Sequence, residues 1–147
     1  MVRYVSGDIL NCDASILLNI VDCHGSLNDS LIRAYAQRFP SAYRIYRSHC
    51  AQYGHKLFGS HINIECYKQR NRRKFLAFIF NREVDKVEFN KIEKPLEDIF
   101  KFAKSHKLTV AVPGNFGFLK PSALYNKLRC KIESLARELD VNLMVYI

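Results

Sequence analysis

Short runs of branched apolar residues alternate along this chain with longer segments whose apolar residues recur every three or four positions. The short runs, at residues 2–5, 15–21, 108–112 and 141–147, are typical of β-strands, most of them buried. The longer segments are typical of helices that bury one face. Because strands that alternate with helices build βαβ units, the pattern predicts an α/β fold with three layers, α/β/α.

Four helices are expected from the spacing of the apolar residues. The first follows Ser26, with Ser26 or Asn28 as its cap, and Pro40 ends it and opens a second helix that stops at Gly54. A third has Pro95 in its first turn, and the longest comes last. Three apolar stripes mark the first, third and fourth helices: Leu27, Leu31, Tyr35 and Phe39; Leu96, Ile99, Phe100 and Ala103; Leu124, Leu128, Ile132, Leu135 and Leu139.

Residues 59–67 and 74–81 are two further β-prone runs, joined by a strongly basic segment. They predict an antiparallel hairpin, which makes the central sheet mixed. Tyr67 and Phe75 flank the basic segment and could stack on nucleic-acid bases. A solvated hairpin end blunted by its charge is the alternative. The expected phosphate contacts of such a nucleic-acid site are Lys68, Arg70, Arg72 and Arg73.

The 147 residues suit one domain, 1–147, and a hydrophobic content of 48% excludes a disordered class. No apolar run is long enough to span a membrane, and the N-terminus lacks the layout of a signal peptide. The five cysteines include no C-x-x-C pair, so we expect reduced thiols and no metal site. We therefore expect a cytoplasmic monomer with no membrane partner.

The charge of the chain favours anionic partners. Lys and Arg total 23 against 14 Asp and Glu, which gives a formal net charge of +9. A field of this sign attracts a nucleotide, a nucleic acid or both.

Two loops carry the features of a phosphate site. Residues 22–28 and 113–121 each follow a predicted buried strand, contain glycine and lead into a helix. Unpaired N–H groups at a helix start attract phosphate, and glycine lets the backbone approach it. Because ligands of such sheets gather at the carboxyl ends of strands, the two loops predict a clamp for a diphosphate. The alternative is that Gly25, Gly114 and Gly117 only shape turns. Neither loop matches the dinucleotide or P-loop fingerprint.

Four stretches resemble the macrodomain family, and within it the branch of terminal ADP-ribose glycohydrolases and phage or toxin–antitoxin DNA-ADP-ribosyl glycohydrolases. They are Ser6-Gly7-Asp8-Ile9-Leu10, residues 16–25 followed by IRAYAQRFPSAYRIYRSHC, VAVPGNFGFL at 110–119, and DVNLMVYI at 140–147. The resemblance runs from about Val5 to Ile147. It implies the macrodomain fold and binding of ADP-ribose or an ADP-ribosyl derivative, without a cofactor.

The resemblance also implies roles for individual residues. Asp8 and Ile9 would contact adenine, residues 22–27 would line the distal ribose and a phosphate, and residues 113–118 would cradle the diphosphate. The expected ligand-binding residues are Asp8, Ile9, Asn19, Cys23, Gly25, Ser26, Leu27, Pro113, Gly114, Asn115, Phe116, Gly117, Phe118 and Tyr146.

The sequence departs from this branch at two places. Asn81 or Arg82 stands where the glycohydrolases have a lysine, and Lys120 stands where they have an aspartate. Arginine stays protonated and lysine cannot replace a carboxylate base, which argues against the lysine-dependent mechanism. Other macrodomains dephosphorylate ADP-ribose 1″-phosphate without that lysine. For such chemistry we expect His24 as general acid or base, with Asp22 orienting it or holding water.

Three functions stay open at this point. The chain is a hydrolase acting on an ADP-ribose derivative through Asp22 and His24, or a degenerate macrodomain that reads ADP-ribose without turnover. The third is a module that associates with nucleic acid through the basic hairpin. Cys23 next to His24 is expected to be an inert thiol, because adjacent residues of an extended segment point opposite ways.

Overall fold

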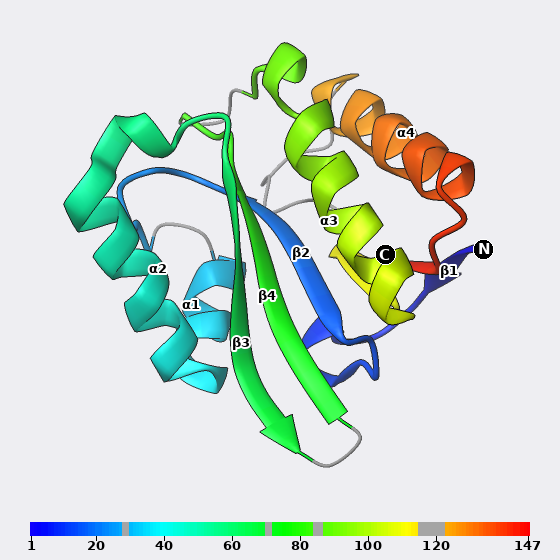
Figure 1. Ribbon diagram of the computed structural model, residues 1–147, viewed down its shortest axis with the longest axis horizontal. Helices are drawn as coiled ribbons and strands as arrows, with labels where there is room; N and C mark the ends of the chain where they lie inside the picture. The colour runs from blue at the N-terminus through cyan, green and yellow to red at the C-terminus, as the bar shows by residue number, and fades with distance from the viewer. Residues whose placement is uncertain (28–29, 70–71, 84–86, 115–122) are drawn as a thin grey trace.

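The computed structural model describes residues 1–27, 30–69, 72–83, 87–114 and 123–147 (Figure 1). A six-stranded sheet carries two helices on each face. The strands are β1 (Val2–Val5), β2 (Ile16–Val21), β3 (His61–Gln69), β4 (Arg72–Phe80), β5 (Val110–Pro113) and β6 (Leu143–Tyr146). The helices are α1 (Ser30–Arg38), α2 (Pro40–Tyr53), α3 (Glu93–His106) and α4 (Ala123–Glu138), with short 3₁₀ turns η1 (Ile9–Asn11), η2 (Gly54–Leu57) and η3 (Phe89–Lys91).

The strand order is β1-β6-β5-β2-β4-β3. All neighbours are parallel except β3, which pairs antiparallel with β4. The predicted mixed α/β sheet and its hairpin are therefore confirmed. β2 lies between β5 and β4, and β1 occupies the edge beside β6, so the first and last strands of the chain are neighbours.

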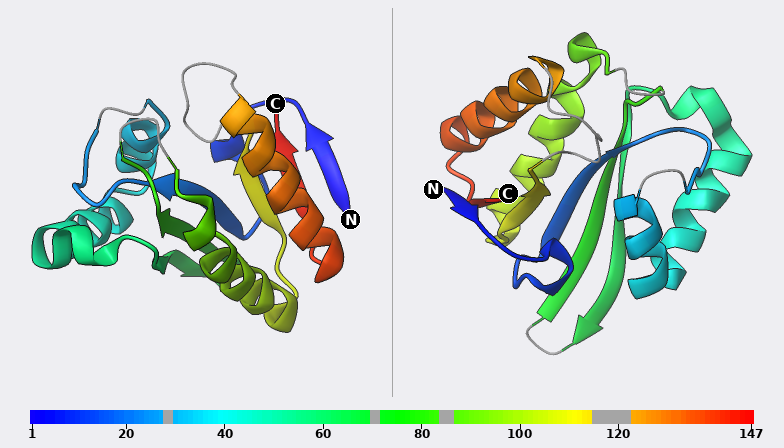
Figure 2. Two further views of the ribbon diagram at one scale, coloured as in Figure 1. Left: turned by 90° about the horizontal axis from the view of Figure 1, so that it is seen from above. Right: turned by 180° about the vertical axis from the view of Figure 1, so that it is seen from behind.

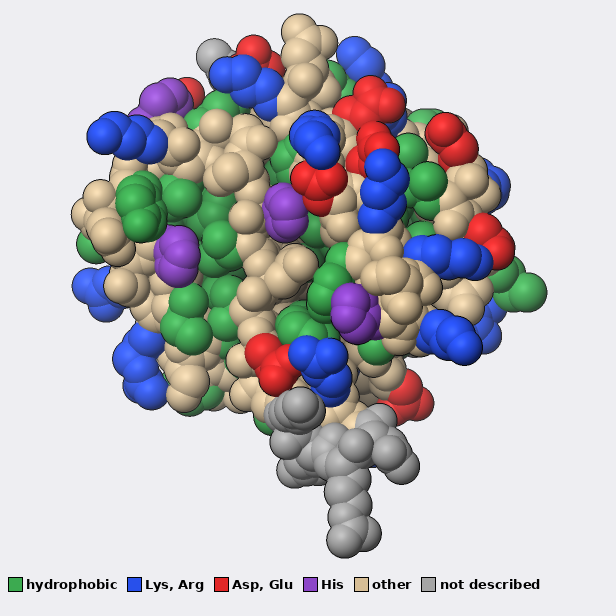
Figure 3. Space-filling view, in the orientation of Figure 1, with side chains coloured by type: hydrophobic (Ala, Val, Ile, Leu, Met, Phe, Trp, Pro, Cys, Tyr) green, Lys and Arg blue, Asp and Glu red, His purple; other side chains and the backbone are tan. Residues whose placement is uncertain are grey.

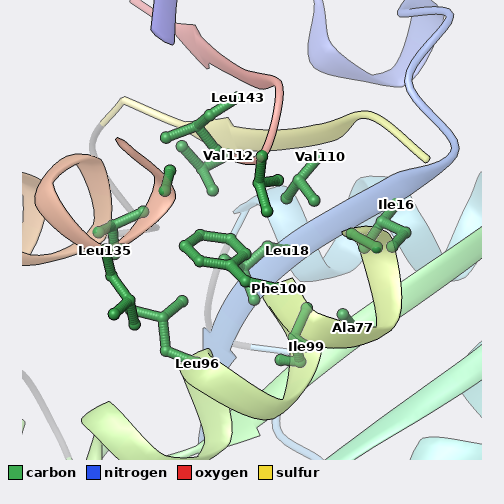
Figure 4. Close-up of a cluster of buried hydrophobic side chains, with 14 of the residues drawn as sticks. Ile16, Leu18, Ala77, Leu96, Ile99, Phe100, Val110, Val112, Leu135 and Leu143 are labelled. Carbon is green, nitrogen blue, oxygen red and sulfur yellow. The ribbon is translucent and has the colours of Figure 1, made fainter. Parts of the chain in front are cut away.

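Both faces of the central strands are buried, as the continuous apolar runs predict. Along β2, Ile16, Leu18 and Ile20 point toward α3 and α4, whereas Leu17 and Val21 point toward α1 and α2. Figure 4 shows the first of these cores, where Phe100 of α3 lies between the sheet and Leu135 of α4. The two helix layers are seen on opposite sides of the sheet in Figure 2.

The predicted helices form, with one correction at the start of α1. Pro40 occupies the first turn of α2, and Gly54 follows its last residue. The apolar residues predicted for α3 are all buried. However, α1 begins at Ser30, so Ser26 is not its cap, and the predicted stripe starts too early: Leu27 precedes the helix and is 43% exposed. Asn28 lies outside the described residues.

None of the helices that the structure describes is long and apolar enough to cross a membrane. All five cysteines are free.

Candidate functional site

A cavity of about 580 Å³ opens at the carboxyl ends of β1, β5 and β6. Its size is in the range of pockets that hold a small organic ligand. It lies at the edge of the sheet where the sequence predicts a ligand. The cavity is lined by Gly7, Asp8, Ile9, Leu10, Ser30, Leu31, Ala34, Pro113, Gly114, Tyr125, Tyr146 and Ile147. Five of these were predicted as ligand-binding residues: Asp8, Ile9, Pro113, Gly114 and Tyr146.

The parallel pairing of β1 with β6 brings the first part of the site together. Val5 pairs with Tyr146, and the N–H of Ile147 donates to the carbonyl of Val5 at 2.9 Å. The segment that follows β1 therefore starts beside the end of β6. There Asp8 caps η1, since its Oδ1 accepts the N–H of Leu10 at 3.0 Å. Asp8 stays exposed at the cavity, whereas Ile9 is buried beneath it.

Gly114 allows β5 to approach the end of β6 closely. Its N–H donates to the carbonyl of Tyr146 at 2.5 Å. A Cβ at this position would lie 2.5 Å from that carbonyl oxygen and 3.2 Å from Cα of Ile147. Both neighbours are backbone, so they could not yield without moving the strands. Gly114 is thus required by packing at the wall of the cavity, whatever its role toward a ligand.

Two tyrosines also line the cavity, and only Tyr146 was predicted. Burial, followed by the neighbouring Cys12, raises the pKa of Tyr146 above its usual value, so its hydroxyl stays protonated. Tyr125 belongs to the first turns of α4, and its hydroxyl accepts a hydrogen bond from Nη1 of Arg129 at 3.3 Å. The preceding residue, Leu124, belongs to the apolar stripe of α4, so Tyr125 lies next to that stripe on the helix surface. That position was the signal that could have identified it.

The loop at residues 22–27 is held by α2. Oδ1 of Asp22 accepts the backbone N–H of His24 at 2.9 Å, the N–H of Ser26 at 3.3 Å and the hydroxyl of Tyr46 at 3.0 Å. The hydroxyl of Tyr43 donates to the carbonyl of Gly25 at 3.0 Å. Asp22 therefore orders the backbone around His24 and contacts its N–H. The His24 side chain is exposed.

None of the described residues 22–27 lines the 580 Å³ cavity, although Ser30 and Leu31, at the start of α1, do. The predicted contacts of Asp22, Cys23, His24, Gly25, Ser26 and Leu27 with a ligand therefore stay predictions. Asn115, Phe116, Gly117, Phe118 and Lys120 lie outside the described residues.

Asn19 and Cys23 are both buried at the end of β2. Oδ1 of Asn19 accepts the N–H of Ile20 at 2.9 Å, and its Nδ2 has no partner among the described residues. An unpaired buried donor costs about 1–3 kcal/mol. Burial, with smaller contributions from Cys50 and Asp22, raises the pKa of the Cys23 thiol to about 11. The thiolate is therefore disfavoured, as expected for an inert cysteine.

Asn81, one of the two residues predicted to stand at the place of the expected lysine, has a structural role. It is fully buried, and its side-chain amide donates to the carbonyl of Glu88 and accepts the N–H of Glu88, both at 2.8 Å. These two hydrogen bonds join the Asn81 side chain to the backbone of Glu88.

The residues predicted to contact nucleic acid separate onto two faces. Arg72 is exposed at the start of β4, whereas Arg73 forms an ion pair with Glu65 at 2.7 Å. The prediction that Phe75 stacks on bases is wrong, because its ring is 5% exposed and packs against Phe102. Arg70 and the side chain of Lys68 are outside the described part. Within that part, no group of three or more His, Cys, Asp or Glu side chains could hold a metal ion.

No protein-family model matches the chain. An ADP-ribose 1″-phosphate phosphatase of Aspergillus oryzae is 34% identical over 53 residues, which are 35% of this chain and 26% of that protein. The chain thus spans about a quarter of the length of the curated relatives that it matches.

Among solved structures, the macrodomain of Mycobacterium tuberculosis DarG has a TM-score of 0.79 and 22% identity, with 99% of this chain and 97% of that chain covered. Thermosipho africanus DarTG in complex with ADP-ribose has a TM-score of 0.74 and 17% identity, with 98% of this chain and 41% of that chain covered. The fold expected from the resemblance is confirmed.

Proposed function

We propose that this chain, whose fold is that of the macrodomains, binds ADP-ribose or an ADP-ribosyl derivative in the 580 Å³ cavity and hydrolyses the derivative. The observation that carries the proposal is the assembly of Asp8, Ile9, Gly114 and Tyr146 from three separate parts of the chain around that cavity. A structure of the same fold, DarTG, is described as a complex with ADP-ribose.

Asp8 and Tyr146 suit the adenosine end of the ligand. Oδ1 of Asp8 takes one N–H in capping η1, and an ionised carboxylate has room for further donors such as the adenine amine. Ile9 and Tyr146 offer apolar and aromatic surface to the ring.

The start of α1 suits the phosphates. Ser30 is the first residue of this nine-residue helix and lines the cavity. N–H groups of a first helical turn lack partners within the helix and carry partial positive charge, so they favour a diphosphate. Pro113 and Gly114, which line the same cavity at the end of β5, would contribute to the clamp. Asn19, whose Nδ2 has no partner among the described residues, is fully buried and does not line the cavity, so its contact with the ligand stays a prediction.

For the chemistry we propose hydrolysis of the ADP-ribose 1″-phosphate type, in keeping with the names of the relatives. Water attacks phosphorus, the bond to the ribose oxygen breaks, and inorganic phosphate leaves. His24 would take the proton of the attacking water or give one to the leaving ribose oxygen. Asp22 would act by holding the backbone of His24, as its hydrogen bonds indicate.

Titration calorimetry with ADP-ribose and phosphate release from ADP-ribose 1″-phosphate test the proposal. Asp8→Asn keeps a capping side chain but loses the charge, so we expect affinity for ADP-ribose to fall roughly tenfold. The affinity for inosine diphosphate ribose, whose base lacks the amine, should differ less between wild type and Asp8→Asn. His24→Ala should abolish phosphate release and leave ADP-ribose binding intact. Wild-type protein that does not bind ADP-ribose would refute the proposal.

The second candidate is a reader that binds ADP-ribose without turnover. It is favoured over a lysine-dependent glycohydrolase, because neither Asn81 nor Arg82 supplies a lysine amine and the side chain of Asn81 is bonded to the backbone of Glu88. Tight calorimetric binding together with no phosphate release and no removal of ADP-ribose from modified DNA would support this candidate.

We further propose that the protein acts in the cytoplasm as a monomer. Its five free cysteines suit a reducing compartment.

A further inference from the structure

We propose that a second pocket of this protein is a binding site for single-stranded nucleic acid, separate from the 580 Å³ cavity. This basic pocket has a volume of about 390 Å³. It is lined by Leu10, Asn11, Cys12, Asp13, Ala14, Ser15, Arg38, Phe39, Tyr67, Arg72, Arg73 and Lys74. The inference does not rest on the proposed function, because it concerns other residues and another ligand.

The basic pocket and the 580 Å³ cavity lie at opposite ends of α1. Ser30, Leu31 and Ala34 of α1 line the first cavity, whereas Arg38, at the end of the same helix, lines the basic pocket. Leu10 lines both. The right view of Figure 2 shows α1 beside the segment that connects β1 to β2. A ligand in the basic pocket therefore contacts the opposite end of α1 from a ligand in the cavity.

Three cations of the basic pocket are not paired with an acid. Arg38 and Arg72 are exposed, and neither side chain has a hydrogen bond or ion pair with any residue that the structure describes. Lys74 is only 6% exposed, and its Nζ donates to the carbonyls of Cys12 at 2.9 Å and Ala14 at 2.5 Å. Asp13 is the acidic residue in the lining. The pocket thus keeps a positive field for phosphate groups.

Some cations elsewhere on the surface have acidic partners. On the face shown in Figure 3, some Lys and Arg side chains lie close to Asp and Glu, whereas others, on the left of the view, do not. Within α3, Lys94 pairs with Asp98 and Lys101 with Glu97. Arg73 also has an acidic partner, although it is among the lining residues of the basic pocket: it forms an ion pair with Glu65, and its guanidinium lies 4.8 Å from the ring centre of Phe75. Successive residues of a strand face opposite sides, so the side chain of Arg73 points away from those of Arg72 and Lys74.

Tyr67 adds an aromatic surface and extends the site. It pairs with Lys74 across the hairpin and is 39% exposed. Together with Arg38 and Phe39 it also lines a neighbouring hollow of about 290 Å³. Two adjoining hollows with cations and an exposed ring suit several linked nucleotides, whose phosphates meet the cations and whose bases stack on the tyrosine. Stacking needs an unpaired base, which favours a single strand over a duplex.

The test is fluorescence anisotropy with a labelled oligothymidine of about 15 nucleotides, measured from about 50 to about 200 mM salt. Oligothymidine lacks adenine, so it does not report on the adenosine end of the first cavity. We expect Arg38→Gln/Arg72→Gln to weaken binding on the order of tenfold and to make the log–log salt slope shallower by about 1.4. Tyr67→Leu should weaken binding roughly fivefold.

Lys94→Gln/Lys101→Gln is the matched control, since it also removes two charges, but from α3 on the other face of the sheet and outside the basic pocket. It should bind within about twofold of wild type. Saturating ADP-ribose should not displace the strand. Equal losses for the control and for Arg38→Gln/Arg72→Gln, displacement by ADP-ribose, equal binding of polyglutamate, or no binding by wild type would each overturn the inference. Circular dichroism melting confirms that every variant is folded.

Discussion

Gly114 lies where β5 comes closest to the end of β6, and the same close contact forms one wall of the candidate site. A side chain there would meet the carbonyl oxygen of Tyr146 at 2.5 Å. We expect Gly114→Ala to lower the free energy of unfolding by about 1–3 kcal/mol, because the strands must separate to admit a methyl group. Urea unfolding measures this loss, and calorimetry with ADP-ribose should show weaker binding.

A graded series separates this steric cause from other effects of the substitution. Gly114→Val should cost more than Gly114→Ala, because more atoms must be placed between the same two strands. Equal stability of wild type and both variants would show that the strands can yield at this point, and Gly114 would then lose its structural explanation.

At the scale of elements, the loop that follows β2 is organised by α2 through Tyr46. The hydroxyl of this buried side chain donates to both the carbonyl and the carboxylate of Asp22, each at 3.0 Å. Tyr46→Phe should lower the free energy of unfolding by about 1.5–3 kcal/mol, because the bond to a charged group is lost. Under the proposed function it should also slow phosphate release, because the backbone at His24 is less ordered.

Tyr43→Phe is the control for that change. Its hydroxyl reaches the same loop but bonds a neutral carbonyl, that of Gly25, so we expect the smaller loss of about 0.5–1.5 kcal/mol. If the two variants were equally stable and equally active, the charge of Asp22 would not be what holds the loop.

The order of the elements could be predicted from the sequence because apolar periodicity is local, as the stripes of α3 and α4 show. The contents of the site could be predicted only in part, because they depend on contacts distant in sequence. Asp8 and Gly114 were found from motifs and loops, whereas Tyr125 and Leu31 reach the cavity through helix packing. The sequence predicted that Asp22 orients His24 or holds water. The packing of α2 shows in addition that its carboxylate orders the backbone of the loop.

The hairpin shows the same limit. Its basic run predicted one charged tip, yet the strand places Arg72 and Arg73 on opposite faces. The register shift between Glu65 and Tyr67 decides which side chains of β3 share a face with Lys74, and periodicity alone does not reveal such a bulge. Phe75 was assigned to the surface from its place in the run, whereas the packing of α3 covers it.

At the scale of the whole molecule, three thiols and one tyrosine hydroxyl between the sheet and the helix layer of α1 and α2 have raised pKa values. Burial is the largest cause that raises the pKa of the thiols of Cys23 and Cys66, each to about 11 from 9.0, and it also raises the pKa of Cys50 and Tyr46. In each case folding favours the protonated form over the charged one.

Stability should therefore decline in alkaline solution. A raised pKa in the folded state means that the contribution to stability is complete below the unfolded pKa, near 9 for a thiol, and is lost as the pH rises toward about 11. Each such thiol contributes a slope of at most about 1.4 kcal/mol per pH unit. Urea unfolding in reductant at about pH 8 and about pH 10 should show the loss, and Cys23→Ala/Cys66→Ala should reduce it. A free energy of unfolding that stays constant over this range would mean that the folded interior accommodates the thiolates, contrary to the burial of Cys23.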